Sequence, residues 1–288
     1  MLTDKIIVLG GSGFLGSHII KALQKAGIGE VTSGDLQPSS SINCDQLKLD
    51  LLDINDTANK LGNYNVIVNC IGQITRPFNL CFTLNSFGIK NLIKALPKKD
   101  TRLIHISTVS VYGSADNCNE ESLLNPETNY ATAKAFAEQI LIENYNIKKL
   151  TILRLSNLYG TNQKKGVFAY LLKSYNSDRK LIFNNDGSLT RHFMHVEDCS
   201  GIIEEVIKNS NLTGIYNIKG NETYTVKDLV QQFENHFDIV FDKSFNKNLP
   251  WENIDNLDDS KIRSAVNIEP KWNLFDFIKE ELKNQNYA

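Results

Sequence analysis

The stretch from Lys5 to Ile20 constrains the fold more than any other part of the chain. Residues 6–9 form an apolar, mostly β-branched run, which is typical of a strand buried on both faces. Gly10, Gly13 and Gly16 follow at equal spacing and lead into an apolar helical face. Glycines at these positions allow a sharp turn, close approach of a pyrophosphate and tight helix-on-strand packing. Because free N–H groups at a helix start bind anions, the stretch predicts a dinucleotide site; the alternative is a strand–turn–helix without a ligand.

Length and charge limit the remaining possibilities. The chain has 288 residues, which suits one large domain and a smaller lobe. A net charge of −2 without a basic block argues against nucleic acid as a partner. The apolar runs are too short to cross a membrane, and the chain enters a strand almost at once, so we expect no membrane partner and no signal peptide.

The cysteines indicate a reducing compartment. Their number is odd, their positions are scattered, and no C-x-x-C pair occurs. This pattern predicts neither a disulfide framework nor a metal site, and a cytoplasmic location fits it best. The five residues are Cys44, Cys70, Cys81, Cys118 and Cys199.

A carboxylate follows the second expected strand. Asp35 lies about 20 residues beyond the glycine turn, at the end of residues 30–34. A carboxylate at this position can accept hydrogen bonds from the adenosine ribose and would repel a 2′-phosphate. No Arg or Lys lies between Val31 and Ile42 to attract such a phosphate. The pattern favours NAD over NADP, with an ordinary turn residue as the alternative for Asp35.

Three further apolar runs alternate with helical patterns. Residues 66–71, 102–107 and 151–155 read as buried strands, and residues 274–284 read as a C-terminal helix. Such alternation predicts a parallel sheet joined by right-handed crossovers. The fold class expected from it is α/β.

A tyrosine and a lysine stand four residues apart on the helix expected after residue 129. Tyr130 and Lys134 therefore share one helix face. Free tyrosine has a pKa of about 10, and a nearby ammonium and a cationic nicotinamide would lower that pKa toward the working pH. We predict that Tyr130 is the catalytic acid/base; exposed surface residues are the alternative.

Thr108 is the third catalytic candidate. It ends the strand of residues 102–107, and open α/β sheets bind ligands at the carboxyl ends of their strands. Its hydroxyl is suited to donate to the reacting oxygen while Tyr130 moves the proton. The alternative is a hydroxyl that merely ends the strand.

Together these motifs resemble the extended short-chain dehydrogenase/reductases, the NAD-dependent epimerase/dehydratase family. The resemblance rests on the G-x-x-G-x-x-G turn, on residues 85–96, on the Tyr130-x-x-x-Lys134 pair and on residues 154–160. It implies a Rossmann-type doubly wound parallel sheet with a small C-terminal substrate-binding lobe. The expected NAD-binding domain is 1–160, to which the chain returns at about 190–210, and the expected lobe is 161–189 with 211–288.

The resemblance also implies site residues. Asp50 would meet the adenine amino group, and a sugar nucleotide would be the substrate. The expected NAD-binding residues are Gly10, Gly13, Phe14, Leu15, Gly16, Asp35, Asp50, Leu51, Cys70, Gly72, Asn85, Tyr130 and Lys134. The expected substrate-binding residues are Thr108, Asn157 and Arg191, and His195 matches a family segment that also fits a packed histidine.

The sequence departs from the family pattern at several points. Sugar-nucleotide dehydratases carry Asp-Glu where this chain has Val109 and Ser110, which argues against dehydration. The pyrophosphate-binding Arg-Pro-Gly-Asp turn is missing before Asp259, and we expect Lys247 or Arg263 to substitute for its arginine. The segment of residues 70–85 is shorter than usual, so the sugar pocket is expected to have a changed shape.

Three activities remain open at this point. The leading hypothesis is an NAD-dependent epimerase that transiently oxidises C4 of a nucleotide-activated sugar. The alternative is an NAD(P)H-dependent 4-keto-sugar-nucleotide reductase, and a lower-ranked alternative is a non-catalytic NAD-binding subunit. The resemblance further implies a homodimer formed through residues 85–96 and 131–145.

Overall fold

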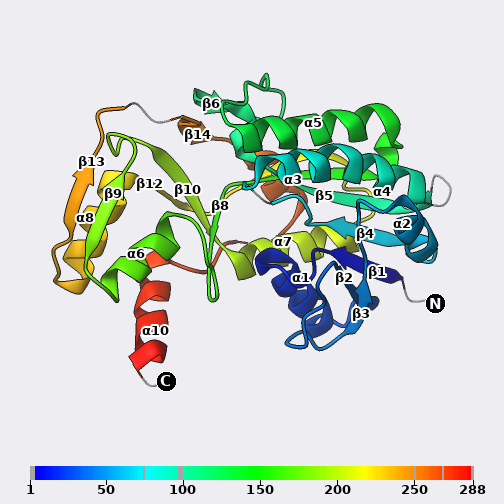
Figure 1. The fold of residues 1–288 in the computed structure, drawn as a ribbon, viewed down its shortest axis with the longest axis horizontal. Coiled ribbons are helices and arrows are strands. Elements are labelled where there is room, and N and C mark those ends of the chain that lie inside the picture. Colours follow the sequence, from blue (N-terminus) through cyan, green and yellow to red (C-terminus); the bar gives the residue numbers. More distant parts are fainter. Residues whose placement is uncertain (1–3, 74, 97–99, 249–250, 268, 287–288) are drawn as a thin grey trace.

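A seven-stranded parallel sheet forms the larger part of the protein (Figure 1). The computed structural model describes residues 4–73, 75–96, 100–248, 251–267 and 269–286. The strand order is β11-β7-β5-β4-β1-β2-β3, so the direction of winding reverses between β1 and β4. The strands are β1 (Lys5–Leu9), β2 (Glu30–Asp35), β3 (Asp45–Lys48), β4 (Val66–Asn69), β5 (Arg102–Thr108), β7 (Leu150–Leu155) and β11 (Gly214–Ile218).

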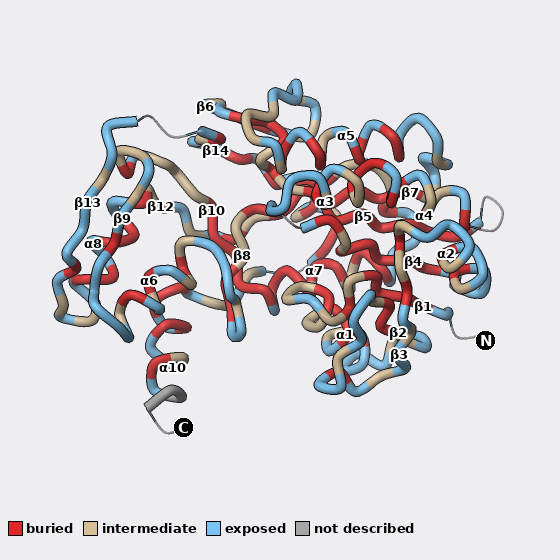
Figure 2. The backbone as a smooth tube through the Cα atoms, in the orientation of Figure 1, coloured by how far each residue is buried: buried red, intermediate tan, exposed pale blue. Residues whose placement is uncertain are grey.

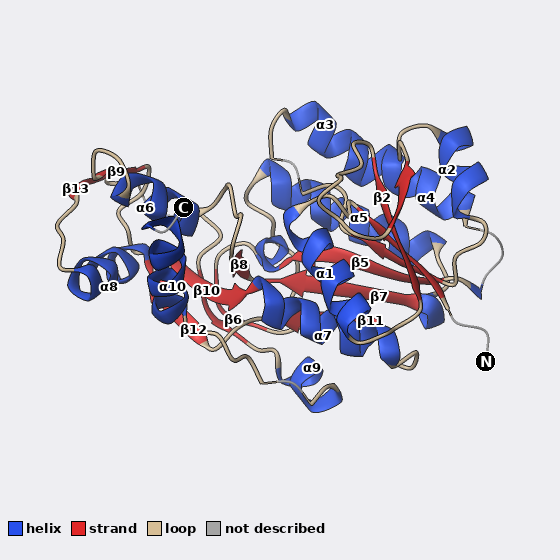
Figure 3. Cartoon of the chain, turned by 90° about the horizontal axis from the view of Figure 1, so that it is seen from below, coloured by secondary structure: helices blue, strands red, loops and turns tan. Residues whose placement is uncertain are grey.

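Helices cover both faces of this sheet, which explains why its central strands are apolar on both sides. Figure 3, seen from below, shows the two helices of one face, α1 (Phe14–Lys25) and α7 (Val196–Lys208). The other face carries α2 (Ile54–Leu61), α4 (Ile89–Ala95) and α5 (Asn129–Asn144). The central strands are buried along their length in Figure 2.

A smaller lobe lies beside the sheet and has its own, largely aromatic core (Figure 1). Its three-stranded sheet has the order β12-β10-β8, and its two-stranded ribbon pairs β13 with β9. The elements are β8 (Asn157–Tyr159), α6 (Val167–Tyr175), β9 (Lys180–Phe183), β10 (Thr190–His195), β12 (Glu222–Thr225), α8 (Val226–Phe237), β13 (Asp242–Phe245) and α10 (Leu274–Asn286).

Short elements complete the chain and bring its last third back to the main sheet. β14 pairs in parallel with β6, and Ile262 of α9 lies in the core beneath the sheet. These elements are α3 (Phe78–Thr83), the π-helix η1 (Leu84–Gly88), the 3₁₀-helices η3 (Val109–Tyr112) and η4 (Ile147–Lys149), β6 (Ala115–Cys118), β14 (Ile254–Leu257) and α9 (Ser260–Ala265).

The α/β class and the parallel sheet expected from the sequence are confirmed. Local signals were accurate where they fix the backbone directly. Asp53 caps α2 by accepting from the amides of Asn55 and Asp56. The helix expected over residues 85–96 is present, but its first turn is the π-helix η1.

The expected division of the chain needs two corrections. Residues 190–195 form β10, which pairs with β8 and β12 and not with the main sheet; only α7 after it returns to the larger core. β11 was expected in the small lobe, but it pairs with β7 as an edge strand of the main sheet. Strand pairing is set by contacts distant in sequence, so the periodicity of residues 190–195 could not show which sheet they join.

Candidate active site

A cavity of about 580 Å³ lies where strands of the main sheet end and the smaller lobe begins. Its position agrees with the rule that open α/β sheets bind ligands beyond the carboxyl ends of their strands, at the point where winding reverses. Nine residues expected from the sequence line it: Gly10, Gly13, Phe14, Leu15, Gly16, Cys70, Thr108, Tyr130 and Asn157.

The glycine turn forms one end of the cavity. Gly10 has φ of 76°, a conformation that favours glycine, and a Cβ on Gly16 would lie 2.2 Å from the carbonyl oxygen of Gly10. Helix α1 starts at Gly13 without a side-chain cap and without an acidic residue in its first turn. Its first amides therefore have no side-chain partner, and the helix dipole favours an anion there.

Asp35 lies beside this turn, as the sequence predicts. Its Oδ2 accepts a hydrogen bond from the amide of Ser12 at 3.1 Å, and its Oδ1 accepts one from the amide of Gln37. The buried Oγ of Ser12 has no hydrogen-bond partner. An unsatisfied hydroxyl, bare helix amides and a glycine-only turn together fit the pyrophosphate of a dinucleotide.

The other expected cofactor residues do not line the cavity. Asp50 Oδ1 accepts from the amide of Leu52, and Leu51 is buried. Asn85 is buried, and its Nδ2 donates to the carbonyl oxygen of Gly72 at 3.0 Å. Since Gly72 has φ of 95° and a Cβ there would lie 2.7 Å from Asn85 Oδ1, the contact fixes the turn after β4.

Helix α5 carries the two residues that the sequence predicts to be a catalytic pair. Thr128 caps the helix by accepting from the amide of Ala131, and Tyr130 and Lys134 follow on one face. The Tyr130 hydroxyl reaches the cavity and donates to Oε1 of Gln73. Burial raises the pKa of Tyr130 in the ligand-free protein, opposite to the direction that we expect once a cationic ligand is bound.

Lys134 lies beneath the cavity and is fully buried. Its Nζ is 3.3 Å from Nε2 of His105, which is also fully buried. Burial lowers the pKa of Lys134 to about 8, and the nearby Glu138 opposes that shift. The lysine can thus exchange its proton near neutral pH.

Thr108 occupies the end of β5 and has a free donor. Its Oγ1 accepts a hydrogen bond from the amide of Ser110 at 3.2 Å and so starts the 3₁₀-helix η3. A hydroxyl that accepts a hydrogen bond keeps its own proton, so the Thr108 O–H stays available to donate into the cavity. The neighbouring Ser107 and Ser110 also line the cavity.

Two further residues, Asn157 and Arg191, are expected to bind substrate, and the structure brings one of them to the cavity. Asn157 lines the wall, whereas Arg191 does not. Arg191 Nη1 donates to the carbonyl oxygens of Thr190 and Glu252. His195 is packed among Tyr159, Trp272 and Phe277, and its Nδ1 accepts from the amide of Glu197, so it serves the core and the start of α7.

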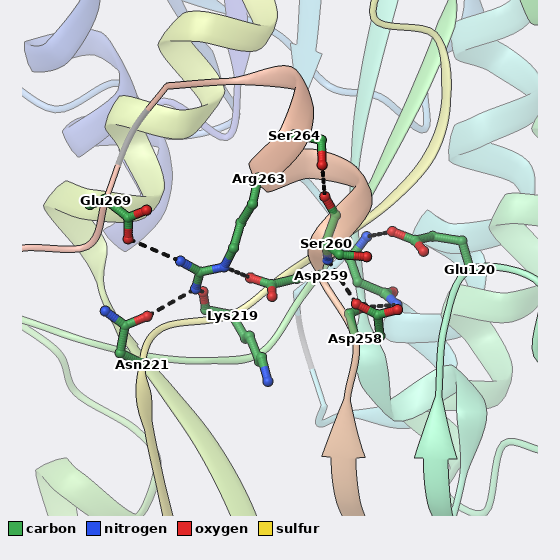
Figure 4. A network of polar contacts seen from close by, with 10 residues as sticks. Glu120, Lys219, Asn221, Asp258, Asp259, Ser260, Arg263, Ser264 and Glu269 are labelled. Atoms are coloured by element: carbon green, nitrogen blue, oxygen red, sulfur yellow. Dashed lines mark hydrogen bonds and ion pairs between the residues drawn. The ribbon is translucent and has the colours of Figure 1, made fainter.

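Neither cation suggested as a substitute for the missing arginine lies on the cavity. Lys247 is exposed after β13. Figure 4 shows Arg263 between Asp259, Glu269 and Asn221, with its Nε 2.8 Å from Asp259 Oδ2. Arg263 also donates to the carbonyl oxygen of Lys219, so its guanidinium ties α9 to the end of β11.

Sequence reasoning missed Gln73 and Lys165, which both line the cavity. Gln73 contacts Tyr130, and its Nε2 donates to the carbonyl oxygen of Ile106 at 3.4 Å. Lys165 stands before Gly166, the N-terminal boundary of α6, and is the one Lys or Arg among the described lining residues. The only sequence signal for it was a Lys-Lys-Gly step in a segment without clear periodicity.

Among the residues that the structure describes, no helix is long and apolar enough to cross a membrane. The same residues contain no group of His, Cys, Asp or Glu that could hold a metal ion.

Comparison with known proteins identifies the family. A model of the NAD dependent epimerase/dehydratase family matches residues 6–218. ADP-L-glycero-D-manno-heptose-6-epimerase of Brachyspira hyodysenteriae is 28% identical over 237 residues, 74% of each chain. dTDP-D-glucose 4,6-dehydratase of Dictyostelium discoideum is 26% identical over 259 residues, which are 76% of this chain and 58% of the relative.

Solved structures agree with this assignment. UDP-glucuronic acid 4-epimerase of Bacillus cereus, solved with UDP-glucuronic acid and NAD, is 26% identical with a TM-score of 0.82 over 96% of both chains. dTDP-glucose 4,6-dehydratase of Bacillus anthracis, solved with NAD, shares the fold at 22% identity and a TM-score of 0.82, over 99% of this chain and 98% of its own. The chain therefore belongs to the NAD-dependent epimerase/dehydratase family, and it is an NAD-dependent enzyme of the short-chain dehydrogenase/reductase type.

Proposed function

We propose that the protein is an epimerase of a nucleotide-activated sugar that acts by transient oxidation at C4. One observation carries this proposal: a single cavity joins the glycine turn at Gly10 to the hydroxyls of Thr108 and Tyr130. A sugar at that point would lie beside the nicotinamide end of a dinucleotide held at the turn. The Bacillus cereus 4-epimerase has a similar fold and carries NAD and its sugar nucleotide together.

The chain's own groups supply the proton chemistry. When bound at the glycine turn, NAD would supply the acceptor for a hydride from the carbinol carbon and the donor for its return. Tyr130 takes the proton of the reacting hydroxyl during oxidation and gives it back during reduction. Thr108 donates its free O–H to the reacting oxygen, and Lys134 holds the ribose hydroxyls of the cofactor and favours the phenolate form of Tyr130.

The cavity argues against dehydration, the activity of several relatives. Loss of water from a sugar needs a further acid or base beside the hydroxyl that leaves. No Asp or Glu is found among the described lining residues; Val109 is buried, and Ser110 lines the wall. The same lack of carboxylates leaves the wall compatible with an anionic diphosphate, for which we propose Lys165 and Asn157 as contacts in place of Arg191.

The choice between epimerase and reductase is testable by cofactor stoichiometry. An epimerase regenerates its NAD in every turnover, whereas a reductase consumes one reduced cofactor per product. We expect the purified protein to interconvert two sugar-nucleotide epimers without stoichiometric added cofactor, as measured by mass spectrometry-coupled chromatography and nicotinamide absorbance. One-for-one consumption of NADH with a 4-keto sugar nucleotide, and no reaction with any epimer pair, would establish the reductase instead.

The protein is expected to bind NAD(H) more tightly than NADP(H). The Asp35 carboxylate beside the turn would face the 2′-phosphate of NADP, and like charges brought together at a binding site cost at least about tenfold in affinity. Titration calorimetry with both cofactors measures the preference. Asp35→Asn is the matched control, because its amide oxygen can still accept from Ser12 while the charge is gone. Tighter binding of NADP(H) by the unmodified protein would contradict the prediction.

We also propose a homodimer in the cytoplasm. Four phenylalanines that are partly or largely exposed gather on α3, η1 and α5, and the rings of Phe82 and Phe136 stack at 5.9 Å. An exposed apolar patch of this kind supports an interface. Sedimentation at micromolar concentration should give a dimer and Phe82→Asp a monomer; a monomeric unmodified protein would refute the interface. The four phenylalanines are Phe78, Phe82, Phe87 and Phe136.

The cytoplasmic location rests on the cysteines. All five cysteines are free, which supports a reducing compartment.

A further inference from the structure

Three fully buried polar side chains are connected in a row by two contacts, and we call them the buried triad. Asn69 ends β4, His105 lies in β5, and Lys134 lies on α5. Asn69 Nδ2 is 3.1 Å from His105 Nδ1, and His105 Nε2 is 3.3 Å from Lys134 Nζ. The proposed reaction gives His105 and Asn69 no role. Polar side chains are costly to bury unless they are hydrogen-bonded, so the contacts that these two make are expected to matter.

The backbone fixes the direction of the first hydrogen bond. Asn69 Oδ1 accepts from the amide of Ile71 at 3.1 Å, so the Asn69 amide nitrogen must face His105. An amide nitrogen only donates, and Nδ1 of His105 is therefore the acceptor. A neutral imidazole that accepts at Nδ1 carries its proton on Nε2.

The proton on Nε2 determines which form of Lys134 fits. An uncharged amine has a lone pair and can accept the Nε2–H of His105. An ammonium has only donors, so two N–H groups would oppose each other across 3.3 Å. If the histidine instead moved its proton to Nδ1, that N–H would oppose the amide of Asn69. The three groups of the buried triad can hydrogen-bond to one another in this order only when Lys134 is uncharged.

We propose that His105 is a positioning residue for Lys134. Asn69 fixes the tautomer of His105, and the buried triad therefore favours the uncharged form of Lys134 in the ligand-free enzyme. The proposal rests on the proposed function, in which Lys134 must be charged to stabilise the Tyr130 phenolate. It implies that Lys134 can take up a proton in the site, and that its ammonium charge is present only below a pH that the buried triad sets.

The surroundings of Lys134 agree with this assignment. Burial is the main cause that lowers its pKa to about 8, and the groups Glu138, Cys70 and Cys81 act in the opposite direction. Burial, the largest cause, lowers the pKa of His105 well below its usual value whether or not Lys134 is charged. His105 is therefore neutral over the working range of pH, as the hydrogen-bond pattern requires.

Asn69→Asp is the variant that reverses the pattern. One carboxylate oxygen can still accept from Ile71, and the other would now accept from an Nδ1–H of His105. The lone pair of Nε2 would then face Lys134 and accept from its ammonium. We expect ¹⁵N NMR of the ligand-free protein to show the Nε2–H tautomer of His105 in the unmodified chain and the Nδ1–H tautomer in Asn69→Asp. An Nδ1–H tautomer in the unmodified chain would overturn the proposal.

The protonation of Lys134 is the second readout. With ¹³Cε-labelled lysine, assigned through Lys134→Arg, we expect Asn69→Asp to raise the pKa of Lys134 by about one unit or more, the scale of one buried hydrogen bond. Asn69→Asp with His105→Phe keeps the new charge but removes the imidazole. A clearly smaller rise in this double variant supports the role of His105; an equal rise would assign the whole effect to charge and refute it.

Catalysis provides an independent check. Ammonium is lost as pH rises through the pKa of Lys134, so the alkaline limb of the kcat profile should move to higher pH in Asn69→Asp. The NMR readouts use ligand-free protein and therefore stand if no sugar nucleotide proves to be a substrate. Conversely, if Asn69→Asp turns over substrate and the alkaline limb of its kcat profile does not move, the link between the buried triad and catalysis is refuted, while the proposed function stays intact. Thermal melting confirms that each variant is folded.

Discussion

Tyr130→Phe should lower turnover by at least roughly a hundredfold, the scale of a lost general acid/base, while NAD binding stays intact. The substitution removes only the hydroxyl that reaches the cavity and donates to Gln73. The ring that remains on α5 fills the same space, so the glycine turn and the wall of the cavity are expected to be preserved. Steady-state kinetics with the epimer pair and titration with NAD measure the two effects.

Gln73→Leu is the matched control for this variant. It removes the same hydrogen bond from the other side and keeps the Tyr130 hydroxyl. We therefore expect a much smaller loss of turnover than in Tyr130→Phe. Near-normal turnover in Tyr130→Phe would assign the proton transfer to another group, and equal losses in both variants would mean that their hydrogen bond matters more than the acid/base role.

Glu138→Leu should lower the free energy of unfolding by about 3–5 kcal/mol, the cost of removing one partner of a buried ion pair. Glu138 of α5 and Arg154 of β7 are both almost completely buried, and their closest atoms are 2.7 Å apart. Glu138 also accepts from the hydroxyl of Ser107, the residue before Thr108. Without the carboxylate, the buried Arg154 guanidinium would keep the hydroxyl of Tyr112 as its one side-chain hydrogen-bond partner among the described residues. Urea denaturation followed by circular dichroism measures the loss.

The double variant Glu138→Leu with Arg154→Met separates the two causes of this loss. Replacing a whole buried ion pair by apolar residues is often nearly neutral, because no charge remains unpaired. We therefore expect the double variant to be more stable than Glu138→Leu alone. A loss below about 1 kcal/mol in the single variant would show that Arg154 finds another partner or water.

Features encoded within one short stretch were predictable from the sequence. The strand–turn–helix at Gly10–Gly16 depends on neighbouring residues, and it is present. The common helix face of Tyr130 and Lys134 was also predictable, because it follows from helix geometry alone. Thr108 followed from its place at the end of a buried strand.

Features that depend on distant partners were not predictable. Arg263 was a candidate phosphate ligand until the structure placed it against Asp259 and Asn221. Lys165 reaches the cavity because the smaller lobe folds against the sheet, and no periodicity in its own segment indicates this. Likewise, the burial of His105 and its contact with Lys134 join residues 29 positions apart. Charged and polar residues of this kind acquire roles only through tertiary contacts.

The path of the chain decides how this enzyme can be divided. β11 closes the edge of the main sheet beside β7, and β14 and α9 return to the same part of the molecule after the chain has passed through the smaller lobe. A fragment ending at residue 160 would leave β7 with an unpaired edge and would lack α7, the partner of α1 on one face of the sheet. Neither lobe is a contiguous module, so no single crossover with a relative can exchange one lobe whole and leave the other unchanged.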